Sequence, residues 1–337
     1  LVLKRREMEG ERTVSVVDVG SLLGLNVLEH SDEADDASRT AARKVLDGWR
    51  SCGFLVITGH GVVGDELEAL ARDFFAKGEC EKLRYAAQRF QQGEARATHV
   101  YRGYLPSTAD GKEGLDFGPR VEADGAAART ANAKLRAWPA FFEEVTEVAS
   151  EELAAAVRAY RRQVERLGAA LMRALALGTG LPLDTYSRRM EGGPSTLRVN
   201  YMPARAEAPC SRSCDGAGLS CPEHVDSGAL TLLRVDREVG GLELCFPGTS
   251  DYVPVVVPDG ALVVNVGATL ELWTQGRVIA TRHRVRFTPN RARVSIPYFY
   301  EPHLDAVVDP VSKETYSQAL ARLWRQLPEY AQLIPKS

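Results

Sequence analysis

The chain has 337 residues, of which 45% are hydrophobic and 26% charged, and its formal net charge is -3. This composition is typical of a globular protein. It offers no basic excess for a nucleic-acid partner and no run of roughly 18 apolar residues for a membrane span. The first residues lack the apolar core of a secretory signal, and six cysteines are too few for a disulfide scaffold. We therefore expect a cytoplasmic protein, and we expect it to be a monomer.

The first half of the chain predicts a mixture of strands and helices. In chain order, we predict strands at 13–19 and 54–57 and helices at 37–52 and 65–76. Residues 87–132 contain repeated loop signals and are the least regular part of the sequence. A long helix follows Pro139, because apolar residues up to Leu175 recur at the spacing of one buried helical face.

After Pro194 the pattern changes to short strands separated by glycine and proline. These strands are predicted at 196–202, 230–235, 242–246, 252–257, 261–266, 283–287 and 294–300. Their regular spacing is typical of a sandwich or barrel, and a helix from Lys313 to Gln326, with Ser312 as its N-cap, closes the chain. We therefore predict a mainly β protein with flanking helices. Its parts are a mixed N-terminal region at 13–135, a long supporting helix at 136–195, a β core at 196–310 and a C-terminal helix at 311–337.

Three residues of the β core have the chemistry of a metal site. His224 and Asp226 are two positions apart, and side chains at that spacing on a strand point to the same face. His283 follows 59 positions after His224, which leaves room for four strands to return the chain to the same place. Two histidines and one carboxylate form the facial triad, which leaves positions open on Fe(II) for a co-substrate and O2.

A second pair of residues is suited to binding a carboxylate. Arg293 and Ser295 again stand two positions apart, so that a guanidinium and a hydroxyl face the same way. An arginine fork can bind a carboxylate through two parallel hydrogen bonds. A dicarboxylic keto acid needs such an anchor at its far end while its keto end chelates iron, and Tyr201 could donate a third hydrogen bond to the acid.

The sequence resembles the iron(II) and 2-oxoglutarate-dependent oxygenases of the isopenicillin N synthase-like branch. The resemblance extends from about Val14 to Pro310. The segments that carry it are 49–62 (WRSCGFLVITGHGV), 224–233, 240–244, 260–267, 281–285 and 293–299.

The resemblance implies a distorted double-stranded β-helix, or jelly roll, with Fe(II) held by His224, Asp226 and His283. It also implies that Arg293 and Ser295 bind 2-oxoglutarate and that Asn200 and Tyr201 assist. The expected reaction consumes O2 and 2-oxoglutarate, releases succinate and CO2, and hydroxylates, desaturates or cyclises a small-molecule substrate. Family members line the substrate pocket with the irregular N-terminal segment and an aromatic residue after the Arg-x-Ser strand. We expect the pocket wall to contain Tyr101, Arg102, Tyr104, Phe117 and Phe299.

Three alternatives remain open from the sequence. The first is an oxidase that uses the same triad without 2-oxoglutarate. The second is a catalytically silent paralogue that only binds the small molecule. The third is a related oxygenase that acts on a protein side chain. A zinc site at Cys210, Cys214 and Cys221 is disfavoured, because their spacing lacks the paired C-x2-C pattern of structural zinc.

Overall fold

The computed structural model describes residues 13–86, 102–107, 111–118, 150–206, 218–236 and 238–325. The strands are β1 (Ser15–Asp18), β2 (Phe54–Thr58), β3 (Gly103–Leu105), β4 (Glu113–Phe117), β5 (Thr196–Met202), β6 (Leu219–His224), β7 (Leu230–Arg234), β8 (Leu242–Cys245), β9 (Tyr252–Pro254), β10 (Leu262–Val266), β11 (His283–Arg286) and β12 (Arg293–Tyr300). The α-helices are α2 (Asp36–Ser51), α3 (Asp65–Phe75), α4 (Glu79–Lys82), α6 (Glu151–Thr179), α7 (Asp184–Ser187), α8 (Ala268–Trp273) and α9 (Tyr316–Trp324). Short 3₁₀ helices are η1 (Gly20–Val27), η2 (Ser31–Glu33), η3 (Leu83–Tyr85) and η7 (Arg188–Met190).

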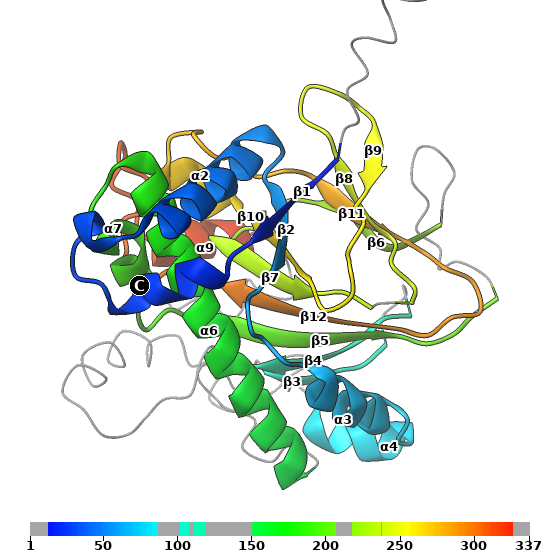
Figure 1. Cartoon of the computed structure of the whole chain (residues 1–337). Helices are drawn as coiled ribbons and strands as arrows, with labels where there is room; N and C mark the ends of the chain where they lie inside the picture. Colours follow the sequence, from blue (N-terminus) through cyan, green and yellow to red (C-terminus); the bar gives the residue numbers. More distant parts are fainter. Residues whose placement is uncertain are drawn as a thin grey trace, which may run out of the picture.

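Two sheets form the centre of the molecule (Figure 1). The large sheet has the strand order β1-β2-β10-β7-β12-β5-β4-β3, and the small sheet has the order β6-β11-β8-β9. This arrangement confirms the predicted jelly roll with flanking helices. Two strands of the large sheet, β3 and β4, come from the segment in which the sequence predicted no strand. They pair with each other, and β4 also pairs with β5, which is distant in the sequence.

Helices cover the outer face of the large sheet. The apolar stripe of α2 packs against α6, and together with the sheet they bury one continuous core (Figure 1). Ser150 caps the start of α6 by accepting a hydrogen bond from Leu153 N at 3.1 Å. The last helix begins later than predicted, at Tyr316, and its N-cap is Thr315, which forms a capping box with Gln318. The assignment of Ser312 as the cap is therefore wrong.

The space between the two sheets is partly filled by apolar side chains and partly open. Phe54 and Val263 of the large sheet pack against Leu242 and Leu244 of the small sheet and exclude water from one half. The rest of the space contains a cavity of about 100 Å³, which both polar and apolar side chains line. Among the helices that the structure describes, none has both the length and the apolar character needed to cross a membrane.

Candidate active site

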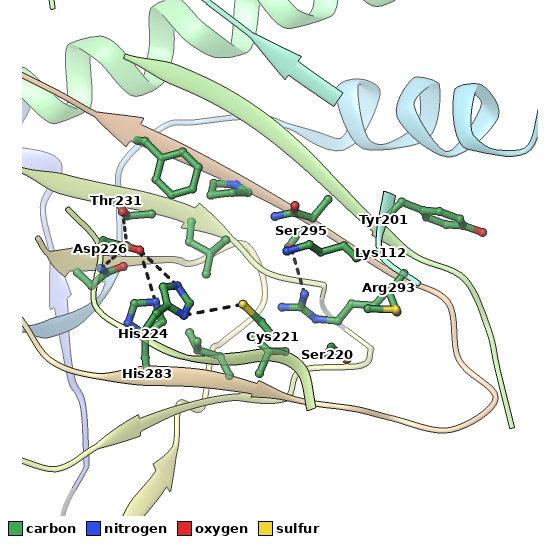
Figure 2. Close-up of a pocket in the computed structure, with 18 residues that line it drawn as sticks. Lys112, Tyr201, Ser220, Cys221, His224, Asp226, Thr231, His283, Arg293 and Ser295 are labelled. Atoms are coloured by element: carbon green, nitrogen blue, oxygen red, sulfur yellow. Dashed lines mark hydrogen bonds and ion pairs between the residues drawn. The ribbon is translucent and has the colours of Figure 1, made fainter. Parts of the chain in front are cut away.

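His224, Asp226 and His283 lie together at one side of the cavity, as the sequence predicts (Figure 2). One ligand atom from each residue lies within 4.8 Å of the others. The Oδ1 atom of Asp226 is 3.5 Å from Nε2 of His224 and 3.8 Å from Nε2 of His283. The two imidazole rings are 4.2 Å apart between centroids. Three potential ligand atoms therefore face one small volume.

The three side chains reach this point from different elements. His224 ends β6, and His283 begins β11 and pairs directly with it, so both imidazoles project from the small sheet. Asp226 lies beyond the end of β6, in the loop that crosses to the large sheet, so the expectation that His224 and Asp226 share one strand is wrong. The start of α8 holds this loop, because Ala268 N donates to Asp226 O at 2.8 Å. A Cβ at Gly267 would lie 2.2 Å from Gly228 O, so only glycine permits this close approach.

Hydrogen bonds orient the ligand atoms toward the shared volume. The Nδ1 atoms of His224 and His283 lie 2.9 Å and 3.2 Å from the carbonyl oxygens of Pro222 and Thr281. Because a carbonyl oxygen only accepts, each Nδ1 carries the proton and each Nε2 can present its lone pair. Asp226 Oδ2 accepts hydrogen bonds from Thr231 Oγ1 at 2.5 Å and Asn265 Nδ2 at 2.8 Å, which leaves Oδ1 facing the histidines. These donors fit a divalent transition metal.

The charges in the triad are tightly coupled. Burial disfavours charge on His224, but hydrogen bonds to Asp226 and Cys221 outweigh it and raise the pKa of His224 to about 11. Burial likewise opposes the charge on Asp226, yet the two histidines, Asn265 and Thr231 together lower the pKa of this carboxyl group. Burial lowers the pKa of His283. The charged carboxylate of Asp226 favours a cation at this position, and a metal ion would bind the unprotonated Nε2 atoms of the two histidines.

Arg293 and Ser295 lie at the other end of the cavity, on neighbouring inward positions of β12. Nη1 of Arg293 donates to Ser295 Oγ at 3.0 Å, and its Nε donates to Gly240 O at 3.0 Å. Burial lowers the pKa of Arg293, and the nearby Asp236 partly offsets that effect. Asn200 lies opposite Ser295 on β5 and lines the same cavity. The end of the pocket away from the triad is thus suited to a carboxylate.

Tyr201 borders the cavity, but its ring is on the other side of β5. Because side chains alternate along a strand, Asn200 points inward and Tyr201 points outward. The Tyr201 ring stacks on Phe75 of α3, with centroids 4.9 Å apart and planes 9° apart. Figure 2 shows this ring turned away from Arg293. The geometry therefore favours Asn200, and not Tyr201, as a partner of the acid.

Of the five expected substrate contacts, Phe299 lines the cavity. Tyr104 donates to Glu113 Oε2 at 2.6 Å on the outer side of the sheet, and Phe117 is buried in the core under the helices. The structure does not bring these two residues to the cavity, because their strand positions alternate with the inward ones. Arg102 is only 1% exposed and donates to Pro194 O and Thr196 Oγ1. Tyr101 lies outside the described residues.

Several residues that sequence reasoning missed also belong to the site. Thr231 and Asn265 hold Asp226, and each interrupts an apolar strand with a polar side chain, which is a signal that the sequence contained. Cys221 lines the cavity between the triad and Arg293, and Lys112 lines it at the end that contains Arg293 and Ser295 (Figure 2). No sequence pattern indicated these two. Cys210 and Cys214 lie outside the described residues.

The chain matches two family models. The model described as the 2OG-Fe(II) oxygenase superfamily matches residues 194–302, and the model described as the non-haem dioxygenase in morphine synthesis N-terminal matches residues 14–141.

Curated proteins and solved structures agree with these matches. The chain is 30% identical to gibberellin 20 oxidase 2 of Oryza sativa subsp. japonica, over 89% of this chain and 70% of the relative. It is 27% identical to homoarginine-6-hydroxylase 2-ODD-233 of the same rice, over 89% of each chain. The structure of the dioxygenase for auxin oxidation in rice superposes with a TM-score of 0.66 at 23% identity, covering 93% of this chain and 95% of that one.

Proposed function

The chain belongs to the 2OG-Fe(II) oxygenase superfamily, and on this premise we propose that His224, Asp226 and His283 hold the iron. The protein is a non-haem Fe(II) enzyme that uses 2-oxoglutarate and O2 as co-substrates. The observation that supports the ligand assignment is the convergence of three ligand atoms within 4.8 Å, with their other polar atoms bonded to the protein. Arg293, Ser295 and Asn200 would bind the distal carboxylate of 2-oxoglutarate.

Iron(II) and 2-oxoglutarate, when bound, supply O2 activation coupled to the loss of CO2 and the formation of succinate. The residues of the chain bind and orient the metal and the co-substrate. Thr231 and Asn265 keep one oxygen of Asp226 engaged, so that the other one faces the metal volume. Arg293 and Ser295 fix the far end of the co-substrate, which directs its keto acid end toward the triad. Leu233, Leu242 and Val285 line the cavity between these ends and exclude water.

The substrate side of the pocket has an aromatic surface that suits a small molecule with an apolar or planar part. The Arg198 guanidinium lies 5.7 Å from the ring centroid of Phe299, which lines the cavity. Asp116, which is fully buried, fixes this guanidinium through two hydrogen bonds of 2.6 and 2.7 Å. Asp116 thus holds Arg198 against the Phe299 ring, and a substrate would place an apolar or planar part against the side of Phe299 that faces the cavity. A small-molecule substrate also agrees with the relatives, which include a homoarginine hydroxylase and a gibberellin oxidase.

The test is to reconstitute the purified protein with Fe(II) and measure succinate formed from 2-oxoglutarate, with and without candidate small molecules. We expect succinate formation to require Fe(II) and O2, to increase with a true substrate, and to disappear in Asp226→Ala and His283→Ala. Substrate oxidation without consumption of 2-oxoglutarate would instead identify an oxidase. A protein that consumes no 2-oxoglutarate under any condition would contradict the proposal.

A further inference from the structure

The cavity end that contains Arg293 also contains a second cationic side chain, Lys112. β4 pairs with β5 such that Glu113 is opposite Tyr201, and β12 pairs with β5 such that Arg293 is opposite Met202. Lys112, which precedes Glu113, therefore lies beside Met202 on the side away from Arg293. Directly opposed residues of antiparallel strands point to the same face. Figure 2 shows Lys112 and Arg293 both reaching toward Ser295.

The charge of Lys112 is not neutralised by the described part of the protein. Among the described residues, no carboxylate forms an ion pair with its ammonium, and Asp226 at the far end is the one acid that lines the cavity. The adjacent Glu113 is on the outer face, where it pairs with Lys82 at 2.5 Å. Asp236 accepts hydrogen bonds from Arg72 and from the backbone N–H groups of three residues. Two like charges in a partly desolvated space repel each other, and a bound carboxylate relieves that repulsion.

The residue before Lys112 has a left-handed backbone conformation that favours glycine. Gly111 has a φ of +71°, and a Cβ there would lie 2.2 Å from Nη1 of Arg205. Gly111 therefore lies next to the Arg205 guanidinium, two residues before β4 begins. Meanwhile the Tyr201 phenol, which the sequence suggested as a further donor, is stacked on Phe75 outside the cavity.

We propose that Lys112 is a second cationic anchor for the distal carboxylate of 2-oxoglutarate, in the position that Tyr201 does not fill. This inference rests on the proposed function. Arg293 and Ser295 would bind one side of the carboxylate, and Lys112 would approach it from the β4 side. The pocket would then select a 2-oxo acid with a second carboxylate over a monocarboxylate of the same length.

The test measures binding directly, by anaerobic calorimetric titration of the Fe(II)-loaded protein with 2-oxoglutarate and with 2-oxopentanoate, which lacks the distal carboxylate. Lys112→Met and Lys112→Gln should weaken 2-oxoglutarate binding about tenfold, as expected for one charge-assisted hydrogen bond at a partly exposed site. Both variants should bind 2-oxopentanoate like the wild type. Lys112→Arg should restore most of the affinity for 2-oxoglutarate. Lys44→Met, the same change at an exposed position of α2, is the matched control.

Unchanged affinity of both Lys112 variants for 2-oxoglutarate would overturn the inference. So would equal weakening for both acids, because that pattern indicates a structural role. Other results would contradict the proposed function. If Arg293→Met bound 2-oxoglutarate as tightly as the wild type, the assignment of Arg293 would be wrong. If the wild type did not bind 2-oxoglutarate at all, both the proposed function and the role of Lys112 would be wrong.

Discussion

Thr231→Val removes a hydrogen bond from Asp226, the carboxylate that we propose as a metal ligand. The Thr231 hydroxyl donates to Asp226 Oδ2 at 2.5 Å, and the residue is 5% exposed. Valine has the same shape, so the core remains packed. A hydrogen bond to a charged group contributes about 1.5–3 kcal/mol, which corresponds to a loss of metal affinity of about 10- to 100-fold. Asn265 still holds the carboxylate at 2.8 Å, so binding should weaken and not disappear.

The assay is competition for Fe(II) between the protein and a chelator of known affinity, under anaerobic conditions. Thr269→Val is the matched control, because Thr269 is 7% exposed and donates to Ser227 O at 2.7 Å in the same loop, without touching a ligand carboxylate. We expect this control to change stability slightly and to retain metal affinity. If Thr231→Val bound iron as tightly as the wild type, the assignment of Asp226 Oδ1 as a ligand atom oriented by Thr231 would be refuted.

Three further perturbations follow from other parts of the structure. Burial raises the pKa of Glu301 from 4.5 to about 7. The folded state therefore favours the protonated carboxyl group. The free energy of unfolding should fall by up to about 3 kcal/mol as the pH rises from about 5 to 8. Glu301→Gln should remove this loss when urea unfolding is compared at pH of about 5 and 8. An unchanged pH dependence in the variant would contradict the role of Glu301. Cys221 lines the cavity, so Fe(II) with 2-oxoglutarate should slow the alkylation of Cys221, measured by mass spectrometry. The exposed Cys80 should not be protected. Equal rates of Cys221 alkylation with and without these ligands would place the co-substrate elsewhere. Gly53 has a φ of +70°, and an added Cβ would lie 2.1 Å from Ile279 O. Gly53→Ala should therefore destabilise the protein by about 2 kcal/mol or more in urea unfolding. An unfolding midpoint equal to that of the wild type would contradict this.

The sequence predicted the architecture well where periodicity was local. The strands after Pro194 and the helices at 37–52 and 65–76 have strong alternating or helical apolar patterns, and the structure contains them. β4 and β6 were missed because each pairs with a strand that is distant in the sequence and has no apolar alternation of its own. β3 was missed because it has only three residues and pairs with β4. The last helix begins at Tyr316 because Thr315 and Gln318 can bond each other's backbone, which outweighs the signal from Ser312.

The candidate site shows the same division between sequence and structure. Residue chemistry and spacing pointed to His224, Asp226 and His283 as one metal-binding group, because two histidines and a carboxylate form a facial triad for Fe(II). Which side of β5 each residue faces was decided only by the register of the folded sheet. That register directs Asn200 and Lys112 inward and Tyr201 outward onto Phe75.

The three residues of the proposed triad can therefore be picked out from the sequence, whereas the residues that surround them in the fold cannot. A ligand set is defined by the donor atoms of a few side chains, and those are fixed by residue type. The wall of a pocket depends on strand pairing between segments far apart in the chain, and a shift of one residue reverses every side chain. Tyr104 and Phe117 have the right chemistry for a substrate wall, but the register of β3 and β4 placed them in the core, and only the folded sheet could decide that.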